Sequence, residues 1–331
     1  MSDQAPQHPA ISTRIIVALL RGLCALPVPL LMTCGRLLAW PLAKLARSRR
    51  RVVLANLALC MPELDRAARE RLADRNLRST ALSLVESLLA WFGPNLSARM
   101  QLIGAEHLER TLAQGRGAIL LTPHFTMLEM VPRVMTEAAP PGAPWLGQLT
   151  EVVRRHNNRQ LEAVVDQGRR RFAATVDKKD VRAMLRVLKA NQVLLTAPDQ
   201  NFSYGAVFAP FFGVPAATTT GNLRLAARSG CPTLPCLIRR NPTGKGWQLR
   251  IEAPIANYPS GDPLADATLS NAMVEAAIRQ APEQYLWAHR RFRSRPPGAE
   301  ALYPDRVLKA HHRTNPEPAD AREQTDAKRS N

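Results

Sequence analysis

The amino-acid sequence predicts an α/β fold with a mixed central sheet flanked by helices. Short continuous apolar runs are typical of strands buried on both faces, and they recur along this chain. Helical periodicity separates several of these runs, as in proteins where strands and helices alternate. The 331 residues, of which 46% are apolar, are enough for one large domain or two ordinary ones.

The N-terminal part differs from the rest in composition. Residues 1–10 are polar and are expected to form a tail, whereas residues 11–60 are apolar and basic. The longest uncharged stretch there, residues 22–35, contains two prolines and falls short of the roughly 20 apolar residues of a spanning helix. Apolar faces beside a basic cluster favour a helical segment associated with an anionic membrane surface. The alternative is a buried helical hairpin with a solvated basic face.

Residues 61–303 are expected to form the main folded domain. Leucines at helical spacing predict a helix over 64–92, which Gly93 and Pro94 end. Strands are predicted at residues 118–121, 193–195, 233–238 and 247–251, and further helices at 180–190 and 220–229. Residues 304–331 are highly charged over most of their length and lack aromatic residues, so we expect a disordered tail there.

Charge and cysteine content restrict the class of function. The net charge of +18 indicates a polyanionic partner, which could be nucleic acid, an anionic membrane or an acidic protein. The basic residues are spread and no nucleic-acid-reading motif is recognisable, so no nucleic-acid partner is expected. None of the five cysteines forms a Cys-x-x-Cys pair, and we expect reduced thiols that act as small hydrophobes.

The first candidate site follows the predicted strand 118–121. Pro123 ends the strand, His124 comes next, and Glu129 lies five residues further on. Residues five apart on one helix point about 140° apart, so the two side chains can meet only if His124 precedes the helix. The carboxylate would then hold one imidazole nitrogen while the other accepts a proton. Alternatively, the histidine caps a helix beside a surface glutamate.

The second candidate site follows the predicted strand 193–195, where open α/β sheets place their ligands. Asp199 and Gln200 come there, followed by an aromatic stretch, residues 202–212, that could wall an apolar channel or belong to the core. The threonines at 218–220 are expected to cap the helix that they open. Arginine clusters, near residues 154–159, 169–171 and 290–295, suit phosphate or carboxylate recognition, or a solvated face.

Taken together and in order, five stretches resemble the bacterial lysophospholipid acyltransferase superfamily, in its lipid A biosynthesis lauroyl/myristoyl acyltransferase branch. The resemblance covers roughly residues 15–303. The matching stretches are residues 56–63, 115–129, 154–171, 198–221 and 281–298. This sequence has Thr126, Met127 and Leu128 where the branch commonly has Gly, Asn and Trp, which leaves acyl length and acceptor open.

The resemblance implies a glycerol-3-phosphate acyltransferase-like fold and an enzyme that moves a fatty acyl chain. The donor would be an acyl carrier protein thioester, and the acceptor a hydroxyl of a lipid A precursor, a phosphorylated glycolipid. The reaction would take place at the cytoplasmic face of the inner membrane, with no cofactor and no metal. Alternatives are another lipid acceptor, such as a lysophospholipid or an amino-acid-derived lipid, and hydrolysis of the thioester.

The resemblance also implies roles for individual residues. His124 would be the general base and Glu129 the residue that orients it. Backbone N–H groups near His124, or Arg154, would stabilise the oxyanion. The substrate-binding residues would be Arg154, Asn158, Arg171, Asp199 and Gln200.

Overall fold

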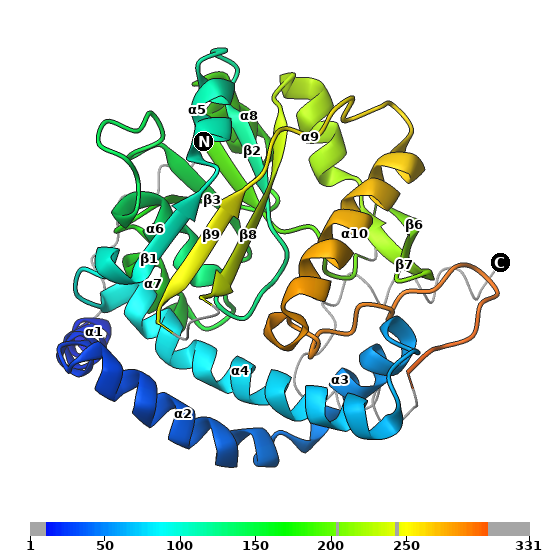
Figure 1. Cartoon of the computed structure of the whole chain (residues 1–331). Coiled ribbons are helices and arrows are strands. Elements are labelled where there is room, and N and C mark those ends of the chain that lie inside the picture. The colour runs from blue at the N-terminus through cyan, green and yellow to red at the C-terminus, as the bar shows by residue number, and fades with distance from the viewer. Residues whose placement is uncertain (1–10, 203–204, 242–244, 304–331) are drawn as a thin grey trace.

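A seven-stranded sheet forms the centre of the computed structural model, which describes residues 11–202, 205–241 and 245–303 (Figure 1). The strands of this sheet are β1 (Met100–Ile103), β2 (Ala118–Leu121), β3 (Leu149–Val153), β4 (Ala174–Asp177), β5 (Val193–Thr196), β8 (Thr233–Arg240) and β9 (Trp247–Ile251). They are ordered β1-β9-β8-β2-β5-β3-β4. Neighbouring strands are parallel except β8 and β9, which are antiparallel. The predicted mixed α/β sheet is thereby confirmed.

Helices flank the sheet (Figure 1). They are α1 (Ile11–Cys24), α2 (Val28–Leu45), α3 (Arg47–Cys60), α4 (Arg66–Phe92), α5 (Ala105–Leu112), α6 (Val131–Glu137), α7 (Arg159–Arg169), α8 (Val181–Lys189), α9 (Gly221–Ser229) and α10 (Pro263–Gln280). Three short 3₁₀ helices complete the described elements: η1 (Ser97–Arg99), η2 (Leu128–Met130) and η3 (Pro282–Gln284).

Helix α4 carries the connection between the N-terminal helices and the sheet. It begins at the N-cap Asp65, whose carboxylate accepts from the N–H of Ala68 at 2.6 Å, and Gly93 follows its last residue. The predicted helix 64–92 is thus confirmed within two residues. One face of α4 buries Asn76, Ser79 and Glu86. Polar side chains at such positions must be hydrogen-bonded, and all three bond to segments that surround the candidate site.

The apolar N-terminal stretch is divided into two helices. Pro27 is the N-cap residue of α2 and Pro29 lies in its first turn, so the chain breaks between α1 and α2. No single helix among the described residues is long and apolar enough to cross a membrane; α1 and α2 together have the length and composition, but they bend by 104°. Helix α2 lies along α4 (Figure 1).

The aromatic stretch after Asp199 contains a β-hairpin. Strands β6 (Ala206–Phe211) and β7 (Val214–Thr219) pair antiparallel and lie against α10. The ring of Phe211 is fully buried and contacts the rings of Phe212, Tyr285 and Phe292. For Phe211 and Phe212 the structure therefore supports core packing, whereas Phe202 and Phe208 are only partly buried.

Other sequence expectations fall on the same architecture. The predicted strands at 118–121, 193–195, 233–238 and 247–251 correspond to β2, β5, β8 and β9. The predicted helices 180–190 and 220–229 correspond to α8 and α9. The two expected tails, residues 1–10 and 304–331, lie outside the described residues. All five cysteines are free and four are buried, as expected of thiols used as small hydrophobes.

Candidate active site

The candidate site lies where two neighbouring strands of the sheet end. Strands β2 and β5 are parallel, with Leu121 opposite Thr196, and both are completely buried. Each strand is followed by a proline and then by a polar residue: His124 after β2 and Asp199 after β5. The carboxyl ends of parallel strands meet at one edge of a sheet. The fold thus brings together two residues that are 75 positions apart in sequence.

The imidazole of His124 is held by Asp199. Its Nδ1 lies 2.5 Å from Oδ1 of Asp199, while the backbone N–H of His124 donates to Oδ2 at 2.9 Å. Both carboxylate oxygens are therefore used, and Asp199 is only 2% exposed. Burial by itself would raise the pKa of Asp199, but the charge and hydrogen bonds of His124 outweigh it and lower the pKa to about 2. The carboxylate is therefore ionised at neutral pH.

This arrangement leaves the other nitrogen of the imidazole open. A neutral imidazole that donates from Nδ1 to Asp199 carries its lone pair on Nε2. Nε2 makes no hydrogen bond to any residue that the structure describes, and the His124 side chain is 22% exposed. An imidazole with one nitrogen fixed by a buried carboxylate and the other free is the arrangement of a general base.

The loop that carries His124 is fixed by the segment after η3. Phe125 forms an antiparallel bridge with Tyr285, the N–H of Thr126 donates to the carbonyl of Gln284 at 2.7 Å, and the N–H of Leu286 donates to the carbonyl of His124 at 2.9 Å. The hydroxyl of Tyr285 also bonds Asp199, which further lowers the pKa of that carboxyl. Residues 284–286 lie 160 to 162 positions from His124, so no local sequence pattern predicts their contact with this loop.

The prediction that the side chains of His124 and Glu129 contact each other is wrong. Glu129 lies in η2, and its carboxylate accepts from Trp91 Nε1 at 2.8 Å and from Arg169 Nε at 2.9 Å, with a second short contact to Nη2 of Arg169. After the bridge between Phe125 and Tyr285 the chain turns at residues 126–127, and the carboxylate of Glu129 bonds side chains of α4 and α7 instead. The catalytic roles of His124 and Glu129 themselves stay predictions.

A second buried carboxyl joins the Glu129 cluster. Glu151 of β3 lies with its Oε2 3.8 Å from Nε of Arg169. Burial, and then the negative charge of Glu129, raise the pKa of Glu151 to about 8, although Arg169 opposes this. The guanidinium of Arg169 thus interacts with two carboxylates, and its distance to Glu129 is shorter than its distance to Glu151. The sequence predicts the arginine cluster at residues 169–171 but does not distinguish Arg169 within it.

The remaining predicted residues have different surroundings. Arg154 is exposed and directly follows β3, at the same edge of the sheet as His124. Asn158 caps α7, accepting from the N–H groups of Gln160 and Leu161. The side chain of Arg154 is therefore open to solvent, whereas the side-chain oxygen of Asn158 accepts hydrogen bonds within the protein.

Two further predictions concern Arg171 and Gln200. Nη1 of Arg171 donates to the carbonyl of Trp91 at 2.8 Å, which ties it to the end of α4. Gln200 is half-buried beside Asp199. Asp199, predicted to bind substrate, is instead the partner of the histidine, so its assignment is corrected. Substrate binding by Arg154, Asn158, Arg171 and Gln200 stays a prediction.

The N–H groups nearest the histidine are already engaged. Those of His124, Phe125 and Thr126 donate to Asp199, to the carbonyl of Pro123 and to the carbonyl of Gln284. Three of the backbone groups that could have stabilised an oxyanion are therefore occupied by the protein itself. The guanidinium of Arg154 is exposed, and no described residue forms a hydrogen bond or ion pair with it.

An apolar cavity of about 460 Å³ lies between α2, α4 and residues 286–289. His124 itself does not line it, but the N–H of Leu286, which does, donates to the carbonyl of His124. Leu42, Leu77, Leu84 and Leu286 contribute to its wall, and His289 closes one side. Burial, and then the charge of His124, lower the pKa of His289 to about 4, so this second imidazole is neutral at pH 7. Its Nε2 accepts from the N–H of Asn201 at 2.9 Å. The cavity therefore adjoins the segment that holds His124.

These features define a class of protein: an α/β enzyme with a carboxylate-held histidine at the carboxyl edge of its sheet, next to an apolar cavity. Comparison with known proteins is consistent with that class. Residues 3–294 match the model of the family described as bacterial lipid A biosynthesis acyltransferase, and the chain belongs to this family. It is accordingly an acyltransferase.

Individual relatives cover most of the chain. The lipid A biosynthesis lauroyltransferase of Escherichia coli (strain K12) is 35% identical over 283 residues, which are 84% of this chain and 90% of the relative. The palmitoleoyltransferase of the same organism has the same identity and coverage. Its myristoyltransferase is 22% identical over 306 residues, 89% of this chain and 91% of the relative.

Proposed function

We propose that this acyltransferase moves a fatty acyl chain from an acyl carrier protein thioester to a hydroxyl of a phosphorylated glycolipid precursor of lipid A. The observation that carries the proposal is the imidazole of His124, held by Asp199 and open at Nε2, beside an apolar cavity. The names of the relatives supply the acceptor class, since all those compared act in lipid A biosynthesis.

In the proposed mechanism, Nε2 of His124 takes the proton of the acceptor hydroxyl as its oxygen attacks the thioester carbonyl. The ionised Asp199 stabilises the imidazolium that forms. The carbon–sulfur bond then breaks, the new ester is released, and the thiolate recovers the proton from the imidazolium. Arg154 is the proposed donor to the developing oxyanion or to an acceptor phosphate, because its side chain is exposed at the same sheet edge.

The scheme gives Glu129 a different role from the one expected from sequence. Its carboxylate is engaged by Arg169 and Trp91, from α7 and α4. We assign it to positioning: it holds those two helices against the loop that carries His124. In this scheme Asp199, instead of Glu129, orients the imidazole of His124. The proposed chemistry requires no cofactor beyond the donor thioester.

The apolar cavity beside His289 is the proposed site of the acyl chain. Its wall is built mostly from leucine and alanine side chains of α2 and α4. Each methylene of the acyl chain that leaves water for this apolar cavity adds about 0.8 kcal/mol to the free energy of binding. The cavity therefore favours a long chain over a short one. The relatives are named for different acyl groups. The acyl chain length that this protein transfers is therefore a quantity for the assay to determine.

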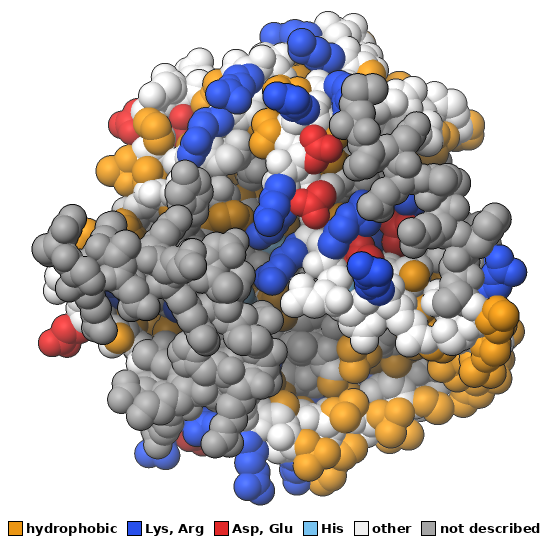
Figure 2. Space-filling model, turned by 180° about the vertical axis from the view of Figure 1, so that it is seen from behind, with side chains coloured by type: hydrophobic (Ala, Val, Ile, Leu, Met, Phe, Trp, Pro, Cys, Tyr) orange, Lys and Arg blue, Asp and Glu red, His pale blue; other side chains and the backbone are white. Residues whose placement is uncertain are grey.

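Membrane association of the N-terminal helices is part of the proposal. Figure 2 shows hydrophobic side chains gathered along one lower edge of the molecule. Large exposed side chains on α1 and α2 supply them: Ile11, Ile15, Leu19, Leu23, Leu30, Leu37, Leu38, Trp40, Leu42 and Leu45. Such a contiguous apolar surface marks a contact site. With a net charge of +18, it fits the anionic cytoplasmic face of the inner membrane.

The test is acyl transfer by the purified protein, with mass spectrometry of the products. Acyl carrier protein thioesters of several chain lengths, and the matching coenzyme A thioesters, are supplied with and without the glycolipid acceptor. We expect acylated glycolipid, and we expect His124→Ala to lower the rate about 100-fold or more with an unchanged circular dichroism spectrum. Near-normal transfer by that variant would contradict the mechanism.

The same assay separates the alternatives. Free fatty acid formed equally with and without acceptor would identify a thioester hydrolase. Acylation of a lysophospholipid or an amino-acid-derived lipid, with none of the glycolipid, would identify another lipid acceptor.

A further inference from the structure

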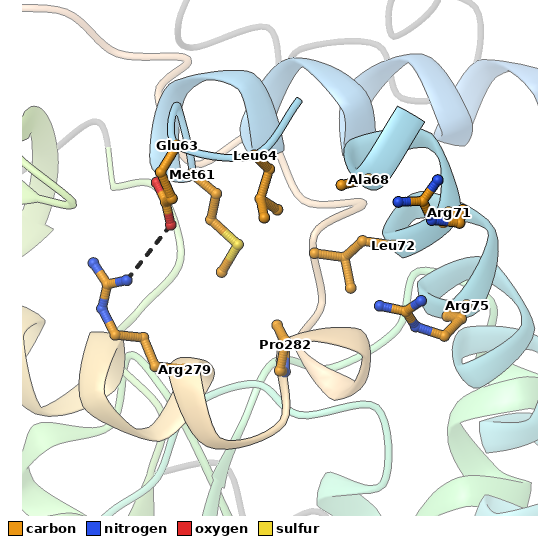
Figure 3. Close-up of a pocket in the computed structure, with 9 residues that line it drawn as sticks. All are labelled: Met61, Glu63, Leu64, Ala68, Arg71, Leu72, Arg75, Arg279 and Pro282. Atoms are coloured by element: carbon orange, nitrogen blue, oxygen red, sulfur yellow. Dashed lines mark ion pairs between the residues drawn. The ribbon is translucent and has the colours of Figure 1, made fainter. Parts of the chain in front are cut away.

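A second pocket lies apart from the catalytic histidine. It has a volume of about 420 Å³ and is bounded by the turn between α3 and α4, the first turns of α4, the end of α10 and η3 (Figure 3). None of its lining residues bonds His124 or Asp199. The proposed reaction leaves this pocket without a role.

The rim of the pocket is positively charged. Arg71 and Arg75 stand one turn apart on α4, and Figure 3 shows their guanidinium groups reaching toward the pocket. Like charges at this spacing repel, and no ion pair or hydrogen bond joins either arginine to another residue in the described ranges. Arg279 approaches from α10, and its Nη1 lies 3.8 Å from Oε1 of Glu63. Three guanidinium groups thus face one carboxylate.

The floor of the same pocket is apolar. Met61 and Leu72 are buried there, with Leu64 and Pro282 beside them. Figure 3 shows Leu72 between the two arginines of α4. Guanidinium groups suit phosphate oxygens because their donors form a planar fork. The cationic rim and the apolar floor together suit an anionic group that is attached to a hydrocarbon chain, rather than a fully hydrated ion.

We propose that this pocket binds the phosphate group of an amphiphilic lipid, with Arg71, Arg75 and Arg279 around the phosphate and the first methylenes on Met61 and Leu72. The pocket is well placed for a lipid, because α1, α2 and the α3–α4 corner lie along the same lower side of the molecule (Figure 1). The phosphate can belong to a membrane phospholipid or to the glycolipid acceptor.

The first experiment measures binding of a monomeric short-chain phosphatidic acid by calorimetry, with no acyl donor present. We expect Arg71→Gln/Arg75→Gln to weaken binding roughly tenfold or more, since each cation near an anionic lipid contributes about fivefold. Arg182→Gln/Arg186→Gln is the matched control, because it removes two exposed arginines at the same spacing on α8. Equal weakening by both variants would overturn the pocket in favour of general electrostatic attraction.

A second variant tests the pocket without changing charge. Ala68 lines the pocket on α4, and Ala68→Trp should fill it and abolish binding of the phosphatidic acid while all arginines remain. Circular dichroism verifies that the variant is folded. Unchanged affinity in Ala68→Trp, or no binding by the natural protein, would overturn the proposal.

Two further arms identify the source of the phosphate. If a phospholipid occupies the pocket, Arg71→Gln/Arg75→Gln should lose affinity for phosphatidylglycerol vesicles and keep its KM for acceptor in detergent. If the acceptor occupies it, that KM should rise while kcat is retained. Because binding is measured without turnover, failure of this proposal is distinguishable from failure of the proposed reaction, which the His124→Ala variant tests.

Discussion

At the scale of single residues, the site depends on which acid holds the imidazole. Sequence spacing suggested Glu129, which is close along the chain, but Asp199 contacts both Nδ1 and the backbone N–H of His124. Asp199 is buried and ionised, whereas Glu129 already neutralises Arg169. The two carboxylates therefore have separable effects on catalysis and on structure.

We expect Asp199→Asn to lower kcat about 10³- to 10⁴-fold, because an amide cannot stabilise the imidazolium and favours the wrong tautomer. Glu129→Gln should lower kcat less and should reduce the free energy of unfolding, since it leaves Arg169 without its main partner. Steady-state kinetics and urea unfolding of both variants check this. The reverse order of the kcat losses would restore the pairing expected from sequence.

His289 predicts a specific pH dependence of stability. Its pKa is lowered to about 4 by burial and by His124, whereas an unfolded histidine titrates near 6.5. Between these values the unfolded chain binds a proton that the folded protein does not. Stability should therefore fall as the pH drops from 6.5 to 4, by on the order of 3 kcal/mol from this residue.

The measurement is urea unfolding of natural protein and His289→Gln at pH 7 and at pH 4.5. The variant should lose less stability between the two pH values. His156→Gln, which removes an exposed histidine, is the control. An identical loss in His289→Gln and the natural protein would contradict the expectation.

At the scale of elements, α4 and β8 hold the loop that carries His124 through a buried ion pair. Arg240 of β8 donates to both carboxylate oxygens of Glu86 on α4, at 2.7 and 2.6 Å. The same guanidinium reaches Ser79 and Thr126, and Thr126 lies two residues after His124. Glu86 also accepts from Trp247 Nε1 at 3.0 Å. This network adds a second attachment of the loop, besides the bonds of His124 to Asp199.

Glu86→Gln should lower the free energy of unfolding by about 3–5 kcal/mol, because it leaves Arg240 partly buried and unpaired. Glu70→Gln is the control, since its pair with Arg66 is largely exposed and should be worth under about 1 kcal/mol. Chemical unfolding of both variants provides the test. Equal, small losses would show that the buried pair adds nothing to stability.

The elements differ in how well the sequence predicts them. Strands β2 and β5 are buried on both faces, so their apolar runs are continuous and were identified. Strand β1 is partly exposed and β4 lies at a sheet edge, so neither has a recognisable pattern. The position of His124 and Asp199 after central strands was predictable. Their pairing was not, because it depends on β2 and β5 being neighbours, which no local pattern specifies.

At the scale of the whole molecule, charge and exposed apolar surface act together. The apolar edge formed by α1 and α2 is continuous over two helices, and the chain as a whole is strongly basic. In the proposed membrane contact, the apolar part would persist in salt, whereas the electrostatic part would be screened. The two contributions are therefore separable by experiment.

Leu37→Gln/Leu38→Gln should weaken binding to phosphatidylglycerol vesicles about tenfold or more, because each leucine that enters the membrane contributes about 1.5–3 kcal/mol. Both side chains are well exposed, at 71% and 60%, so folding should be unaffected. Vesicle sedimentation at low and high salt is the measurement, and Leu161→Gln/Val181→Gln, at exposed sites on α7 and α8, is the control. Equal affinities of the two variants would argue against membrane contact through α2.

Leu42 and Leu84 each line the cavity beside His289, and each is also exposed on the outside of the molecule, at 44% and 62%. Through Leu42 the lining of the cavity is continuous with the exposed apolar surface of α2. A fatty acyl chain that enters the cavity along this surface would remain in contact with apolar groups. For a twelve-carbon tail, avoiding passage through water spares a penalty of roughly 9 kcal/mol.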